Sequence, residues 1–211
     1  MTHDFPETRW SQLLELRDPA HPQYAQHLER LAKQYWQPVF HYAQALRSAD
    51  PEDVTQQFFA MLLARRDLEK LSPERGSFRG FLKTALRHFL LSADRAAKLR
   101  ADLPLCEDAD WRTPEEAFDR EWARGVLVEA TARLRREWPA ASFEIFREYC
   151  LEENGASYAG LARKHGLSED DVRNRLREAR LRLREILEDL LRDYLTPGQD
   201  VEAELRFILS K

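Results

Sequence analysis

The chain has 211 residues, of which 43% are hydrophobic and 33% charged, with a formal net charge of −4. This length fits one large globular domain or two small ones, at about 100 to 150 residues per domain. The acidic balance excludes a protein that binds nucleic acid through a uniformly basic surface. No apolar run reaches the roughly 20 residues that a membrane-spanning helix needs. With no secretory signal at the start, MTHDFPETRW, we expect a cytoplasmic protein.

Apolar residues recur at helical spacing in four segments of the first half, and no segment alternates as a strand does. The sequence therefore predicts an all-α protein. The four segments lie at 10–16, 28–42, 54–62 and 78–89. Asp50 is the expected N-cap of a helix that begins at Pro51, and Ser77 is the expected cap of the fourth helix.

Charge changes sign abruptly in the middle of the chain. Residues 72–100 contain seven basic side chains and two acidic ones, whereas 102–121 contain eight acidic and two basic ones. The acidic stretch also contains Pro104 and Pro114 and shows little apolar periodicity, which is typical of a linker. The predicted organisation is a first helical domain (1–100), an acidic linker (101–122), a second helical domain (123–192) and a C-terminal helical extension (193–211).

The second domain contains a pattern typical of a helix-turn-helix, SYAGLARKHGLSEDDVRNRLREARLRLR. Ser157 is expected to cap a short helix, Gly166 to take the left-handed turn position, and Ser168 to cap the next helix. An ordinary helical hairpin could satisfy the same pattern. The arginine ladder that follows favours DNA binding, because only Glu178 interrupts it.

Three acids open this second helix, where phosphate contacts would be unfavourable. Glu169, Asp170 and Asp171 occupy the first turn, where carboxylates stabilise a helix through its dipole by about 0.3 to 1 kcal/mol. Asp171 also completes a Ser-x-x-acid capping box with Ser168. We therefore expect the DNA-reading side chains one turn further on.

These residues resemble the promoter-binding domain of bacterial sigma factors of the extracytoplasmic-function type. The first half of the chain resembles the same family. PEDVTQQFFAMLL resembles the family's polymerase-docking helix, and FRGFLKTALRHFLLSADRAAKLR resembles the helices that melt the minus-ten element. The ending DVEAELRFILSK resembles a branch common among Planctomycetes. The resemblance implies a sigma factor that binds core RNA polymerase and directs promoter recognition and transcription initiation.

The resemblance also implies a set of DNA contacts. Arg173, Asn174 and Arg177 share a face and would read the minus-thirty-five element in the major groove, because arginine suits guanine and asparagine suits adenine. The remaining implied contacts are Arg175, Arg180 and Arg184 on phosphates or polymerase, and Arg79, Lys83, Arg87 and His88 on the minus-ten single strand. The interleaved Phe78, Phe81 and Phe89 are expected in the core rather than on DNA.

The implied partners are promoter DNA and core RNA polymerase, through its beta-prime clamp helices and beta flap. The polymerase-binding residues would be Asp53, Gln56, Gln57 and Phe58. Relatives usually carry an acid at Gln57, so one hypothesis is that a serine/threonine kinase restores the charge on Thr55. The alternatives are that Asp53 and Glu52 suffice, and that an anti-sigma factor is the regulator.

Other classes of function find less support. A stand-alone helix-turn-helix regulator would need strong duplex affinity, which a net acidic chain disfavours. We expect no enzyme, cofactor or metal site, because no nucleophile–base pair, phosphate loop or Cys/His cluster is visible. The apolar tail is expected to fold back after Thr196-Pro197-Gly198, either packing on the second domain or covering a DNA or polymerase surface.

Overall fold

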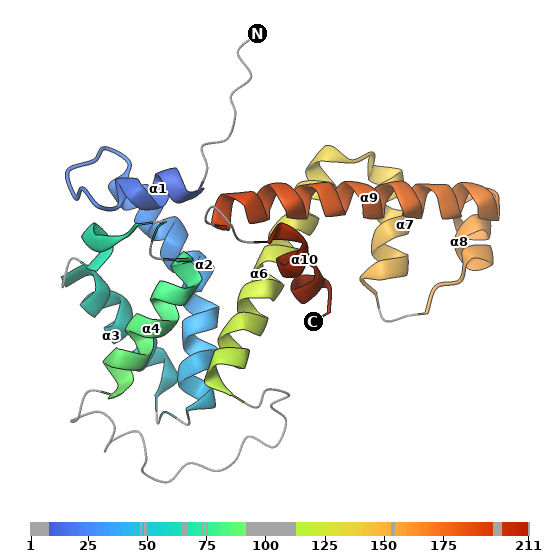
Figure 1. Ribbon diagram of the computed structural model, residues 1–211. Helices are drawn as coiled ribbons and strands as arrows, with labels where there is room; N and C mark the ends of the chain where they lie inside the picture. The colour runs from blue at the N-terminus through green and yellow to red at the C-terminus, as the bar shows by residue number, and fades with distance from the viewer. Residues whose placement is uncertain are drawn as a thin grey trace. The chain divides into compact units, whose positions relative to one another are not determined.

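The protein is all-α in every part of the chain that the structure, a computed structural model, describes (Figure 1). The described residues are 9–46, 48, 50–64, 67–72, 74, 76–91, 113–152, 155–195 and 200–210. No strand occurs among them, which confirms the predicted fold class. No helix within these ranges is long and apolar enough to cross a membrane.

The chain divides into two compact units, residues 1–125 with 192–211 and residues 126–191. The first unit contains α1 (Arg9–Glu15), α2 (Tyr24–Ala45), α3 (Pro51–Ala64), a 3-10 turn (Asp67–Lys70), α4 (Phe78–Leu91), the first half of α6 (Pro114–Glu137), and α10 (Val201–Leu209). The second unit contains the rest of α6, α7 (Ala140–Cys150), α8 (Tyr158–His165) and most of α9 (Glu169–Tyr194).

Aromatic side chains fill the core of the first unit. Phe58 and Phe118 are fully buried, and Phe58 meets Phe89 edge to face at 5.7 Å between ring centroids. Tyr35 contacts Phe78 in the same way at 5.3 Å. Edge-to-face pairs of this kind stabilise a core beyond the area that they bury. The expected core position is confirmed for Phe78 and Phe89, which are 2% and 6% exposed, whereas Phe81 is only half-buried and stacks on Phe78.

Side-chain caps fix the helix starts that the sequence predicted. Asp50 Oδ1 accepts a hydrogen bond from the Asp53 amide at 2.9 Å, directly before Pro51 opens α3. Ser77 Oγ accepts from the Gly80 amide at 3.1 Å at the start of α4. Each cap satisfies one of the amides that a helix leaves unpaired in its first turn.

The acidic segment departs from the linker prediction. Helix α6 begins at Pro114, and Ala117, Phe118 and Trp122 are buried in the first unit, so the end of the predicted linker is helical core. A capping box starts the helix: Thr113 Oγ1 accepts from the Glu116 amide at 3.1 Å, and the Thr113 amide donates to Glu116 at 3.0 Å. The predicted linker residues up to 112 lie outside the described ranges.

The C-terminal extension folds as helix α10, capped by Asp200, whose carboxylate accepts from the Glu202 amide at 2.9 Å. Leu205 and Ile208 are buried. The helix belongs to the first unit, whereas the sequence led us to expect a tail that packs on the second domain. The predicted stop at 196–198 lies outside the described residues.

Candidate nucleic-acid interface

Helices α8 and α9 are joined by a tight turn of three residues. Ser157 Oγ accepts a hydrogen bond from the Gly160 amide at 3.1 Å and caps α8. Gly166 ends α8 in the left-handed conformation, with φ 66° and ψ 36°, where a side chain would be strained. The Leu167 amide donates to the Ala162 carbonyl at 2.9 Å and closes the turn. The predicted caps and turn glycine of α8 are therefore confirmed.

Among the acids at the start of α9, Asp171 caps and stabilises the first turn of the helix. Asp171 donates its amide to Ser168 Oγ at 3.1 Å, and its carboxylate accepts from the Ser168 hydroxyl at 2.6 Å and the Ser168 amide at 3.2 Å. These bonds to Ser168, first from the hydroxyl and then from the backbone, lower the pKa of the Asp171 carboxyl. The predicted capping box is confirmed.

Helix α9 has one buried and one exposed face. Val172, Leu176 and Ala179 are at most 1% exposed and form part of the core of the second unit. Asn174 and Arg177 lie on the exposed side, and neither side chain has a hydrogen bond or ion pair within the described ranges. Two polar side chains that can donate to a base edge are thus held out on a rigid helix.

Two other arginines of α9, Arg173 and Arg180, contact neighbouring side chains. Arg173 donates to Asp170 at 2.6 Å and lies over the Tyr158 ring, 5.6 Å from its centroid. Arg180 lies over the Tyr149 ring at 5.4 Å. Exposed pairs of this kind contribute little stability, so Arg173 can exchange Asp170 for another acceptor at small cost.

Two of the four side chains predicted for the minus-ten strand are already occupied in the first unit. Lys83 donates to both carboxylate oxygens of Asp119 at 2.9 Å. Arg79 donates to Glu204 of α10 at 2.8 Å and its Nε lies 3.6 Å from Asp119. The other two, Arg87 and His88, are exposed on α4.

Aromatic rings complete the enclosure of Arg79. Its guanidinium lies 4.2 Å from the centroid of the Trp122 ring and 5.8 Å from that of Phe207. Only 18% of the Arg79 side chain is exposed. Because its partners come from α6 and α10, Arg79 cannot reach a phosphate while both helices stay in place.

Three of the four predicted polymerase-binding residues are accessible on α3. Asp53 and Gln56 are exposed and Gln57 is half-buried, with Gln57 Nε2 donating to Asp53 at 2.5 Å. Phe58 is fully buried. Its assignment as a polymerase contact is wrong for this conformation, because a core side chain has no surface to offer.

Thr55 is also fully buried, and its hydroxyl donates to the Pro51 carbonyl at 2.7 Å. A kinase needs an accessible hydroxyl on an extended segment, whereas this one is enclosed within helix α3. The burial of Thr55 therefore argues against its phosphorylation in this conformation. The polar residue type suggested exposure, but threonine can bury its methyl group while its hydroxyl bonds to the helix backbone.

Two groups of residues could not be found from the sequence pattern. The partners of Arg79 and Lys83 come from distant segments, and a charge run alone does not identify them. Glu15, His21 and His27 come together near α1, although their six-residue spacing matches no familiar ligand motif.

Comparison of the chain with protein-family models, curated proteins and solved structures found no match.

Proposed function

We propose that this chain is a sigma factor that binds core RNA polymerase and directs promoter recognition in the cytoplasm. The observation that carries the proposal is the exposed face of α9 with Asn174 and Arg177 directly after the α8–α9 turn. Support also comes from the motif blocks of the first half, which occur in the order that the sigma resemblance implies.

The second unit would read the minus-thirty-five element. Arg177 can donate two hydrogen bonds to the O6 and N7 atoms of guanine, and Asn174 can pair with the N6 and N7 atoms of adenine. Arg173 would join them on leaving Asp170, while Arg175 and Arg180 would contact phosphates. Phosphate contacts set the register of α9 on the duplex, and base contacts give sequence preference.

The first unit would bind polymerase through α3 and the minus-ten strand through α4. Asp53, Gln56 and Gln57 present an acidic and polar surface for a basic partner. Arg87 and His88 are available for single-stranded DNA in the described conformation, whereas Arg79 and Lys83 must first exchange their carboxylate partners.

Co-purification with core RNA polymerase tests the proposal most directly. We expect the tagged chain to retain the polymerase core subunits and the reconstituted holoenzyme to start transcription from a cognate promoter. Tight duplex binding by the free chain, with no retention of polymerase, would contradict the proposal and favour a stand-alone regulator. The salt dependence of that binding would count its phosphate contacts.

Replacement of Arg177 by alanine tests the base-reading face. We expect transcription from the cognate promoter to fall roughly five- to 150-fold, because a lost bidentate base contact costs about 1 to 3 kcal/mol. Polymerase affinity should be unchanged, since Arg177 is exposed and off the buried face of α9.

The matched control is Arg136→Ala, which removes the same charge from an exposed position on α6. It should leave promoter preference intact. Equal transcription by the Arg177 and Arg136 variants at every promoter tested would contradict the assignment of Arg177 to base reading.

A further inference from the structure

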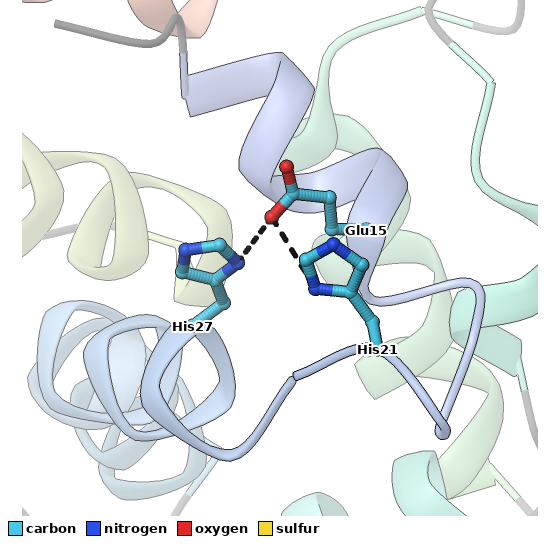
Figure 2. Close-up of side chains that lie close together, drawn as sticks. All are labelled: Glu15, His21 and His27. Carbon is cyan, nitrogen blue, oxygen red and sulfur yellow. Dashed lines mark ion pairs between the residues drawn. The ribbon is translucent and has the colours of Figure 1, made fainter. Parts of the chain in front are cut away.

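Three potential metal ligands converge at the junction of α1 and α2. Glu15 is the last residue of α1, His21 lies in the connection, and His27 lies in the first turns of α2. Figure 2 shows the two imidazole rings on either side of the Glu15 carboxylate, with all three side chains pointing toward one another. Their ligand atoms lie within 4.8 Å of one another.

Two of the three separations between the ligand atoms are close to those around a shared cation. Glu15 Oε2 is 2.9 Å from His27 Nδ1 and 3.7 Å from His21 Nδ1. Two ligands that bind a tetrahedral Zn²⁺ at 2.0–2.1 Å lie about 3.3 Å apart, between these two separations. Small rotations of the side chains would make both distances equal.

The cluster is poorly satisfied by hydrogen bonds alone. His27 is 5% exposed, and neither its Nδ1 nor Glu15 Oε2 has a hydrogen bond, although the two buried atoms are only 2.9 Å apart. The contact is close but lacks the alignment that a hydrogen bond requires. Buried polar atoms without a partner are rare and costly.

His21 adds a second acceptor rather than a donor. Its Nδ1 accepts a long hydrogen bond of 3.3 Å from the Gln23 amide, and a metal ion on this nitrogen would replace that bond, because an imidazole nitrogen has a single lone pair. The same nitrogen faces Glu15 Oε2, which is also an acceptor. A cation between these two atoms would bring together two groups that each offer an electron pair.

A metal ion fits the chemistry of all three groups. Imidazole nitrogen suits zinc and its neighbours in the transition series, and a carboxylate lowers the net charge of the site. The cationic side chains nearby point to other partners: Arg30 donates to Gln12 at 2.8 Å, and Arg17 donates to the Glu69 carbonyl at 3.1 Å. Among the described residues, neither arginine pairs with Glu15.

We propose that Glu15, His21 and His27 form a binding site for a divalent transition-metal ion, with zinc as the first ion to test. Water would complete the coordination at the fourth position. The ion would tie the seven-residue α1 to α2, since one ligand comes from each helix and one from their connection. The site is independent of the proposed promoter recognition.

Titration of the full chain with Zn²⁺ after removal of metal by chelation tests this site. We expect saturation at one equivalent and a higher melting temperature with zinc, because an ion that binds only the folded state stabilises it. Co²⁺ in place of zinc should give the strong visible absorption of a tetrahedral site.

Two variants assign the ligands. His21→Ala, at a half-buried position in a connection, should fold and weaken zinc affinity at least about tenfold, since even changes outside the ligand set cost 10- to 100-fold. Glu15→Gln should do the same. Loss of the zinc-dependent rise in melting temperature should accompany both substitutions.

The matched controls remove other potential ligands. His88→Ala and Cys150→Ser, both at exposed positions, should leave the affinity and the single equivalent unchanged. Absence of saturable binding, or equal affinity in wild type and His21→Ala, would overturn the proposal and leave the close contact of His27 with Glu15 as the role of the cluster.

Discussion

Removal of all residues after Pro197 is expected to destabilise the first unit and to strengthen its binding of single-stranded minus-ten DNA. The loss of stability follows from Leu205 and Ile208, two buried side chains worth about 1.5–3 kcal/mol each, or about 3–6 kcal/mol together. The gain in DNA binding, which rests on the proposed function, follows from Arg79. This side chain would lose Glu204 and Phe207 and become accessible to a phosphate.

Two measurements distinguish a helix α10 that only packs on the first unit from one that also covers Arg79. Thermal or urea unfolding gives the stability, and the salt dependence of single-strand affinity counts phosphate contacts. Each added contact steepens the dependence of log K on log salt by about 0.7 for a single strand. Truncation should add at most one contact, because Arg79 loses Glu204 but keeps Asp119 and Trp122 of α6 beside it, and Asp119 still holds Lys83. Lower stability without any gain in affinity would show that α10 only packs.

A point variant avoids the loss of the helix. Glu204→Gln removes the charge that faces Arg79 but keeps the buried Leu205 and Ile208. Its control is Glu202→Gln, which removes the same charge from an exposed position of α10. Only the Glu204 variant should bind single strands more tightly while it melts close to wild type. Equal affinity of the two variants would contradict a covering role for α10.

The local features of the fold could be predicted because they depend on neighbours in the sequence. The capping box of Ser168 and Asp171 spans only four residues. Gly166 adopts the left-handed conformation because glycine has no Cβ atom, which its own identity in the sequence reveals. The helices follow from apolar spacing, which repeats within each segment. Such signals need no knowledge of how distant segments meet.

The partners of the charged residues could not be predicted in the same way. Arg79 and Glu204 are 125 residues apart, and nothing in either segment indicates their contact. A run of bases therefore suggested an open DNA surface where the structure has an enclosed arginine. The acidic segment was misjudged for a related reason, because its many charges obscured the buried Phe118 and Trp122.

The cluster of Glu15, His21 and His27 was not predicted because its members follow no helical or hairpin spacing. His21 lies in a connection whose path turns it back toward Glu15, and that path depends on the whole junction. The sequence signal that could have found it is the occurrence of a carboxylate and two histidines within 13 residues, 15–27. That signal is weak until the distances are known.

Replacement of Thr55 by glutamate should unfold the first unit rather than activate it. The Thr55 side chain is fully buried and its hydroxyl bonds to the Pro51 carbonyl. Glutamate is larger and charged, so the substitution overpacks the core and buries an uncompensated charge, at about 3–5 kcal/mol. Thr55→Val keeps the shape and should change stability by at most about 1 kcal/mol, the worth of one hydrogen bond.

The control for the added charge is Gln56→Glu, at the exposed neighbouring position of α3. This variant should unfold within about 0.5 kcal/mol of wild type, as surface substitutions usually do. Urea unfolding of the three variants measures the differences, and core-polymerase affinity shows which of them changes docking. We expect Gln56→Glu to strengthen docking on a basic clamp surface, because it places an acid beside Asp53 on the accessible side of the helix. A Thr55→Glu variant that is as stable as wild type and binds polymerase more tightly would contradict this burial and restore the kinase hypothesis.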